Sequence, residues 1–453
     1  MKNELIKKYN VAGPRYTSYP TVPYWNTEVP KVEDWKEAVK KSFTTTNATD
    51  GISIYIHLPF CESLCTYCGC NTRITKNHAV ENKYIAALLK EWKMYLEVFE
   101  ETPRIREIHL GGGTPTFFSS ENLEKLINGI LSTGIVCDDA AFSFEAHPNN
   151  TTVEHLQTLY DLGFRRLSLG IQDFDIAVQT IVNRVQPIEN VEQVVNAARS
   201  IGYTSINFDL IYGLPLQTMY SVIDTIHKVN VLRPDRIAFY SYAHIPWVKP
   251  GQRKFTEKDL PVDEAKRALY EKGKELFEEM GYVEIGMDHF ALKSDGLYKA
   301  AEAGKLHRNF MGYSDSYTEL MVGLGVSSIS DTWNAFGQNV KKVEEYYELI
   351  DKNELPIFKG HFLTNEDELI RKHILNIMCR FQTSWQQQSE QCDAVFAAIT
   401  RLAEMEKDKL VVITPFHLKV TEAGRPFIRN ICMSFDARLW SNLPQSQIFS
   451  STV

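Results

Sequence analysis

The sequence predicts an α/β fold built on a parallel sheet, and two observations support it. From Ile52 onward, apolar runs rich in β-branched and aromatic residues alternate with helix-like stretches, and each apolar run ends at a glycine, a proline or a polar residue. This alternation is typical of parallel strands joined by crossover helices. Six such units favour a barrel-like or open sheet, short of a full eight-stranded barrel.

The predicted elements follow one another in a simple order. An N-terminal arm leads to a short helix around 31–43. Helix-like stretches between the strands include 84–99 and 121–131, and 282–290 is predicted as an additional strand. The six strands of the repeating pattern are predicted at 52–59, 105–113, 141–148, 165–174, 205–215 and 236–244.

The pattern changes near residue 340, where helix-like segments follow one another. EDELIRKHILNIMCRF and SEQCDAVFAAITRLAEMEKD predict helices, and LVVITPFHLKVTEAGRPFIRNI predicts a hairpin and then a helix. We therefore expect three parts. These are an arm with a short helix at 1–50, a barrel domain at 51–354 and a smaller, mainly helical domain at 355–453.

Composition and charge narrow the class of protein. The net charge of −8 argues against general nucleic-acid binding, although local arginines can still bind an acidic small molecule. No run of about 18 apolar residues is present, and the first residues lack the apolar core of a secretory signal. We expect a cytoplasmic protein with reduced cysteines.

The stretch CESLCTYCGC, 61–70, holds four of the eight cysteines. Cys61, Cys65 and Cys68 have the spacing C-x3-C-x2-C in the loop after the first predicted strand, at the end of a parallel sheet where active sites lie. Three thiolates can bind three irons of a 4Fe-4S cluster and leave the fourth open. The alternative is a structural zinc site that uses all four cysteines, or three and His57. Zinc usually takes cysteine pairs from separate elements, which favours the cluster.

Other polar or glycine-rich positions follow the next strands. GGGTP, 111–115, allows close approach of a ligand to the backbone, or is a plain tight turn. Glu145, Gln172 and Asp209 lie at or near successive strand ends, and Arg184 follows. Each alone is more often a structural residue, but together beside a cysteine cluster they indicate a binding site.

The N-terminal stretch GPRYTSYPT, 13–21, is either a docking tail or an arm over the mouth of the barrel. In the second interpretation Arg15 pairs with a substrate carboxylate. Tyr16, Tyr19, Phe310 and Tyr313 are candidates for apolar walls of a substrate site, although aromatic residues more often serve as core.

C-x3-C-x2-C, followed by GGGTP, resembles the radical S-adenosylmethionine (SAM) enzymes. GPRYTSYPT, YIHLPFCESLCTYCGCNT, INFDLIYGLPLQT, IGMDHFA, LHRNFMGY and FIRNICMSFD resemble, more narrowly, the oxygen-independent coproporphyrinogen III oxidases (dehydrogenases), from about residue 8 to 435. The resemblance implies an incomplete (β/α)6 barrel. It also implies oxidative decarboxylation of two propionates of coproporphyrinogen III to vinyl groups, giving protoporphyrinogen IX, by a 5′-deoxyadenosyl radical.

The resemblance also implies the cofactors and their sites. A 4Fe-4S cluster would bind Cys61, Cys65 and Cys68, and two SAM molecules would bind. Arg15 and Tyr55 are assigned to catalysis. The first SAM would contact Tyr55, Gly112, Glu145 and Ile329. The second would contact Tyr67, Gly113, Thr114, Gln172, Arg184, Asp209 and Ala243. A monomer with an unidentified electron donor and acceptor is expected.

Three departures and two rival functions remain. Met311 stands where many of these oxidases have glutamine. YSDSYTELMVG, 313–323, differs from the threonine- and glutamine-rich version of the family. His147 stands where aspartate is common, and it is more simply a structural histidine. The rivals are another radical SAM enzyme on the same scaffold, such as a methylase or a heme-modifying enzyme, and a protein that binds or delivers heme.

Overall fold

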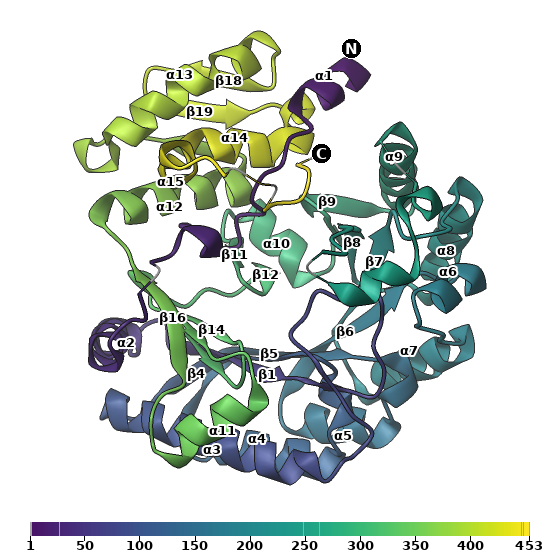
Figure 1. Ribbon diagram of the computed structural model, residues 1–453, viewed down its shortest axis with the longest axis vertical. Helices are drawn as coiled ribbons and strands as arrows, with labels where there is room; N and C mark the ends of the chain where they lie inside the picture. Colours follow the sequence, from purple (N-terminus) through teal and green to yellow (C-terminus); the bar gives the residue numbers. More distant parts are fainter. Residues whose placement is uncertain are drawn as a thin grey trace.

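The computed structural model describes residues 2–26, 28–247, 249–261, 263–444, 446 and 448–452. Its central element is a twelve-stranded sheet in the order β16-β15-β14-β13-β1-β4-β5-β6-β7-β8-β10-β9 (Figure 1). The run from β13 to β8 is parallel, and β16 and β9 form the two edges, so the barrel is incomplete. The six predicted strands are confirmed as β1 (Ile52–Leu58), β4 (Arg104–Gly112), β5 (Ile135–Ala146), β6 (Phe164–Gln172), β7 (Ser205–Tyr212) and β8 (Arg236–Ser241).

Helices cover the outer face of this sheet (Figure 1). Their apolar sides pack on the buried side chains of the strands and form one large core. The predicted helix near 31–43 is α2, whose Trp35, Val39 and Phe43 belong to that core. The helices around the sheet are α2 (Val32–Thr46), α3 (Val80–Phe99), α4 (Ser120–Leu131), α5 (Val153–Asp161), α6 (Ile176–Ile181), α7 (Ile188–Ile201), α8 (Met219–Leu232), α9 (Asp263–Glu279) and α11 (Val343–Asp351).

The sheet extends beyond the predicted strands at both edges. The single strand expected at 282–290 is wrong, because β9 (Tyr282–Gly286) and β10 (His289–Leu292) form an antiparallel hairpin that turns at Met287, whose φ is +45°. At the other edge lie four strands that the sequence pattern did not reveal, since they are short. They are β13 (Leu320–Leu324), β14 (Ile329–Asp331), β15 (Ala335–Asn339) and β16 (Ile357–Phe362).

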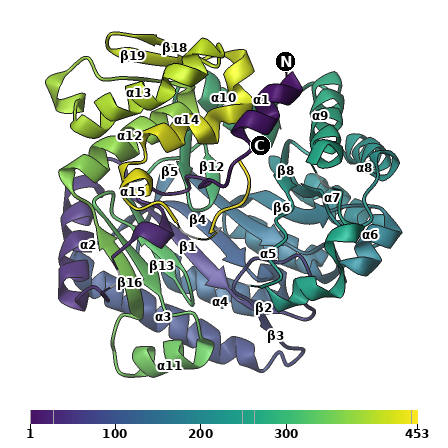
Figure 2. The ribbon, with the colours of Figure 1, turned by 45° about the horizontal axis from the view of Figure 1, so that its top comes forward.

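The C-terminal part has its own core and packs over the barrel (Figure 2). The hairpin expected near 410–420 is β18 and β19, with β17 beside them. Because β16 still pairs with β15, we propose that this domain begins after Phe362 rather than at 355. Its elements are α12 (Asn365–Arg380), α13 (Asp393–Lys407), α14 (Ile428–Phe435), α15 (Ala437–Ser441), β17 (Gln382–Ser384), β18 (Val411–Thr414) and β19 (His417–Val420).

The N-terminal arm is anchored in this second core. It begins with a helix that was not predicted, α1 (Lys2–Tyr9), which lies beside α14 (Figure 2); the Tyr9 carbonyl accepts a 2.8 Å hydrogen bond from Asn430 Nδ2. Tyr16 and Tyr19 are 2% and 1% exposed within the C-terminal core. Of the two alternatives for these tyrosines, wall of a substrate site or core, the structure shows the core.

The remaining short elements connect these parts. They are β2 (Phe60–Cys61), β3 (Arg73–Ile74), α10 (Gly296–Glu302), β11 (His307–Asn309) and β12 (Gly312–Ser314). Across the described residues, no helix is long and apolar enough to cross a membrane.

A buried carboxylate ties α3 to the short edge strands. Glu91 is fully buried and accepts hydrogen bonds from Gly325 N at 2.8 Å, Asn339 Nδ2 at 2.7 Å and the Tyr346 hydroxyl at 2.7 Å. Burial raises its pKa to about 7, although the three hydrogen bonds oppose the shift. The folded protein thus holds this proton at a pH where the unfolded chain has lost it.

We expect Glu91→Gln to remove a pH dependence of stability. The wild-type contribution is fully present below about pH 4.5 and is lost as pH rises through about 7, since the folded state binds the proton more tightly. From pH 5 to 8 the wild type should lose about 2–3 kcal/mol of unfolding free energy relative to the variant. Urea unfolding at pH 5, 6, 7 and 8 measures this, and parallel pH profiles of the two proteins would contradict it.

Candidate functional site

The cysteine loop lies directly after β1, at the carboxyl end of the parallel strands. Cys61, Cys65 and Cys68 are half-buried free thiols. Two groups from other elements reach them: Thr114 Oγ1 is 3.2 Å from Cys61 Sγ, and Arg184 Nη1 is 3.5 Å from Cys65 Sγ. The fold thus brings the three cysteines together with two residues predicted to bind cofactor.

The glycine turn after β4 is tied to the backbone that leads into Cys61. Gly113 N donates to the Leu58 carbonyl at 2.8 Å, and Thr114 N donates to the Phe60 carbonyl at 3.1 Å. A Cβ on Gly113 would lie 2.6 Å from the backbone of Pro59, and Gly112 has a φ of +113°. Glycine is therefore required sterically at Gly113 and conformationally at Gly112.

The concave face of the sheet carries polar side chains. Along β5 to β7, buried apolar residues that pack on the helices alternate with half-exposed polar residues on the other face, as strand geometry demands. Asp209 accepts from Ser168 Oγ at 3.0 Å and from Asn207 Nδ2 at 2.9 Å. Glu145 accepts from Gly112 N at 3.3 Å. In a closed eight-stranded barrel, apolar side chains fill the interior. Here the corresponding face of the sheet carries polar side chains that can bind a ligand.

Other predicted cofactor residues gather around the same mouth. The Tyr55 hydroxyl is 3.1 Å from His57 Nδ1. Tyr55 on β1 also lies opposite Gly323 on β13, and the backbone of Ile329 packs against Gly323. Gln172 ends β6 with a φ of +67°, and Arg184 Nη2 donates to the Gly170 carbonyl at 2.6 Å. Tyr67 packs on a small apolar cluster behind the loop, and Ala243 is exposed just after β8.

Arg15 lies apart from the cysteines. It forms an ion pair with Asp288 through Nη2, and its guanidinium is 5.9 Å from the ring of Tyr240 on β8. Sequence reasoning missed Asp288, although it stands in the quoted segment IGMDHFA. It also missed Lys266, which donates to the Tyr242 carbonyl at 2.6 Å. Burial, and then Arg15, lowers the pKa of Lys266 to about 8. Its sequence did not distinguish it as a site residue, because it lies in a helix rich in charged residues.

The surroundings of Cys61 and Cys68 shift the pKa values of these two thiols in opposite directions. A hydrogen bond with Cys70 is the largest effect that lowers the pKa of Cys68, to about 6, with Lys249 and Arg184 contributing. Burial raises the pKa of Cys61 to about 11. Burial also raises the pKa of Asp209 to about 6, with Glu145 adding to the shift. Cys68 is therefore ionised more readily than Cys61, and the thiolate is the form that binds a metal.

The donor set fits an iron–sulfur cluster better than a single metal ion. Thiolates on one zinc all lie about 2.3 Å from it, so their sulfurs crowd together. Among the described residues, no three His, Cys, Asp or Glu side chains converge on a single metal position. A cubane instead takes one thiolate on each of three irons, and three free thiols on one loop beside a glycine turn can supply that donor set.

His147 and Met311, two of the three departures, have local hydrogen bonds. His147 Nδ1 accepts from Asn149 N at 3.1 Å, and burial, and then Arg184, lowers its pKa to about 3. It is a neutral capping histidine, in agreement with the structural interpretation. Met311 lies in the turn between β11 and β12, where its backbone N donates to Asn309 Oδ1 at 2.9 Å.

Comparison with known proteins agrees with this site. The sequence profile of the radical SAM superfamily matches residues 55–229, which include the cysteine loop and the strands β4 to β7. The site and the match together define a radical SAM protein.

Full-length relatives narrow the class. Oxygen-independent coproporphyrinogen III oxidase from Salmonella typhimurium is 37% identical over 440 residues, which cover 96% of this chain and 95% of the relative. The enzyme of that name from Synechocystis is 37% identical over 99% of this chain and 97% of its own. The crystal structure of the Escherichia coli coproporphyrinogen III oxidase, described as a radical SAM enzyme, superposes with a TM-score of 0.88 at 35% identity, over 96% of this chain and 98% of that one. The chain belongs to the oxygen-independent coproporphyrinogen III oxidase family.

Proposed function

We propose that this enzyme converts two propionates of coproporphyrinogen III to vinyl groups without oxygen, giving protoporphyrinogen IX for heme biosynthesis. The observation that carries this is the full-length similarity to oxidases of that name, which extends over the arm and the C-terminal domain. The three thiols beside the glycine turn supply the chemistry that such an oxidoreductase needs.

Cys61, Cys65 and Cys68 would hold three irons of a 4Fe-4S cluster. With SAM bound and one electron from an external donor, this cluster would supply a 5′-deoxyadenosyl radical for hydrogen abstraction from the propionate β-carbon; the carbon dioxide and one electron that leave the substrate would complete the oxidation. The protein's own contribution is to position the groups. The Gly112 amide and Glu145 lie 3.3 Å apart beside the loop, where they offer a donor and an acceptor to the amino acid part of SAM.

Two SAM molecules would bind in this mouth. The first would contact Tyr55, Gly112, Glu145 and Ile329, on β1, β4, β5 and β14. Tyr67, Gly113, Thr114, Gln172, Arg184, Asp209 and Ala243 would form the other. Asp209 supports the second site. Its carboxylate is half-buried and, among the described residues, accepts hydrogen bonds from neutral donors, so it suits the ammonium group of a ligand.

The substrate brings four carboxylates to an acidic protein, so local cations must bind them. Arg15 pairs with Asp288 through Nη2, and within the described residues its other N–H donors have no hydrogen-bond partner, so they can bind a propionate. Arg308 is 5% exposed, and its buried Nε and Nη1 have no partner among the described residues. A buried guanidinium without an anion is costly, which supports a carboxylate partner supplied by substrate.

An anaerobic turnover assay on reconstituted protein tests the function. It contains coproporphyrinogen III, SAM, a low-potential reductant and an electron acceptor. We expect protoporphyrinogen IX together with about two 5′-deoxyadenosines per product, one for each vinyl group. Deoxyadenosine without protoporphyrinogen would indicate a different radical SAM reaction. Tight heme binding with little SAM cleavage would indicate heme delivery.

We expect Arg15→Ala to lower turnover about 10- to 100-fold while iron content and SAM binding stay unchanged, because a charged hydrogen bond to substrate is lost. Arg15→Lys should recover part of the activity. Arg199→Ala is the matched control, since Arg199 also pairs through Nη2 with an aspartate, Asp235, and has similar side-chain exposure. Equal turnover of the Arg15 and Arg199 variants would remove Arg15 from catalysis.

The proposed partners are an external electron donor and acceptor, and the proposed state is a cytoplasmic monomer. All eight cysteines are free thiols, which supports a reducing compartment. Analytical ultracentrifugation of the anaerobic holoenzyme measures the oligomeric state.

A further inference from the structure

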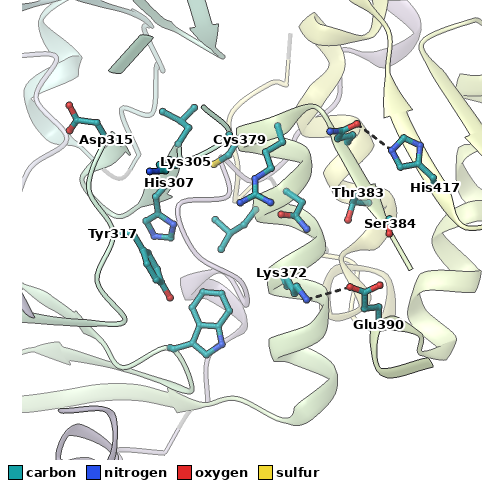
Figure 3. Close-up of a pocket in the computed structure, with 17 residues that line it drawn as sticks. Lys305, His307, Asp315, Tyr317, Lys372, Cys379, Thr383, Ser384, Glu390 and His417 are labelled. Atoms are coloured by element: carbon teal, nitrogen blue, oxygen red, sulfur yellow. Dashed lines mark hydrogen bonds and ion pairs between the residues drawn. The ribbon is translucent and has the colours of Figure 1, made fainter. Parts of the chain in front are cut away.

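A second cavity lies between the barrel and the C-terminal domain, away from the cysteine loop. Its volume is about 770 Å³, within the range of small-molecule sites. Figure 3 shows His307, Asp315 and Tyr317 on one side and Thr383, Ser384 and His417 on the other. Nothing in the reaction proposed above uses this space.

An ion-pair layer separates this cavity from the mouth of the barrel. Asp315, on the cavity wall, pairs with Arg166 and with Arg236 Nη2, the latter at 2.9 Å. Arg166 and Arg236 stand at the amino-terminal ends of β6 and β8, whereas the cysteines follow the carboxyl end of β1. Although burial opposes the shift, the two arginines lower the pKa of Asp315 to about 2. Its charge is therefore compensated by the barrel and does not repel an anion.

Among the other charged residues that line the cavity, cations outnumber carboxylates. Lys305 and Arg380 line it, and within the described part of the chain neither side chain has a carboxylate partner. Lys372 lies 3.6 Å from Glu390 (Figure 3). In a chain of net charge −8, two unpaired cations in one cavity are a local attraction for an anion.

An aromatic surface completes the wall. Trp333 lines the cavity. Its backbone φ is +70°, a conformation that a bulky residue adopts only when its surroundings enforce it. Here Asp331 accepts from Trp333 N at 2.8 Å, and Arg371 donates to its carbonyl at 2.6 Å and stacks 4.3 Å from its ring. Tyr317 packs edge-on to both Trp333 and His307.

We propose that this cavity is a second binding site, for an anionic ligand that carries a flat ring. Trp333 and Tyr317 would contact the ring, and Lys305 and Arg380 would bind its carboxylates or phosphates. His307 adds a neutral imidazole, since burial, and then Arg371, lowers its pKa to about 3. The proposal does not depend on the reaction at the mouth.

The test is calorimetric titration of anaerobic, cluster-loaded protein saturated with SAM. Two probes combine a flat ring with negative charge and differ in the charged group: ATP carries phosphates, and protoporphyrin IX carries carboxylates. Tripolyphosphate and adenosine test the charge and the ring separately. The cavity variant is Lys305→Glu/Arg380→Glu, at two exposed positions near helix ends. The control is Lys125→Glu/Lys352→Glu, with the same charge change at exposed positions on α4 and the end of α11.

We expect at least one probe to bind the wild type and the control equally, and the cavity variant about tenfold or more weakly. Trp333→Ala should weaken the same probe but not tripolyphosphate. Coproporphyrinogen turnover should be equal in the cavity and control variants, which keeps this test separate from the function of the mouth. Absence of binding by both probes, or equal affinity in the cavity and control variants, would overturn the proposal.

Discussion

Replacement of Cys61, Cys65 or Cys68 by alanine is expected to abolish bound iron and reduce 5′-deoxyadenosine formation to background. Each of the three cysteines would bind a different iron, so loss of one thiolate leaves one iron without its protein ligand. The fold should survive, since the three thiols are half-buried at the mouth and are not core packing residues.

The control and the rival interpretation use other cysteines. Cys392→Ala, at a half-buried cysteine in the C-terminal domain, should keep both iron and activity. Cys70→Ala should keep the iron, whereas a zinc site on all four thiols would need Cys70 as much as the others. Iron and sulfide analysis with the optical spectrum of anaerobic protein measures each variant. Full cluster loading in Cys65→Ala would refute the three-cysteine assignment.

Gly113→Ala is expected to have the second largest effect. The added Cβ would meet the Pro59 carbonyl carbon and oxygen at 2.6 Å, and these are backbone atoms that cannot rotate away. Relief requires the Pro59–Phe60 segment to move, and this segment leads directly into Cys61. We expect about 1–3 kcal/mol of destabilisation. Turnover should fall about a hundredfold, because a shift of about 1 Å in the reacting groups is enough for such a loss.

Gly69→Ala is the matched control within the same loop. A Cβ there meets nothing within 4 Å, although Gly69 lies between Cys68 and Cys70. It should therefore retain stability, cluster and turnover. Thermal unfolding, iron content and the turnover assay compare the two variants. If Gly113→Ala were as active as Gly69→Ala, the backbone contact would not position the loop.

The sequence by itself determined the parallel core and the identity of the cysteine loop. The strands β1 and β4 to β8 could be predicted because each is an apolar run that ends at a turn residue before a helix, a local property of the chain. The C-x3-C-x2-C spacing is local too, since all three thiols belong to one short loop. Glu145 and Asp209 could be proposed because parallel strands bring their carboxyl ends to one edge.

Only the tertiary structure decided contacts between segments far apart in the chain. The edge strands β13 to β16 are short, and their hydrogen-bond partners, rather than their own sequences, make them strands. The arm's Tyr16 and Tyr19 have the composition of a ligand site but are buried by the C-terminal domain. The ion pair of Arg15 with Asp288 joins residues 273 positions apart. The second cavity likewise lies where the two cores meet. The hydrophobic periodicity of a single segment predicts its own secondary structure but not its contacts with a distant segment.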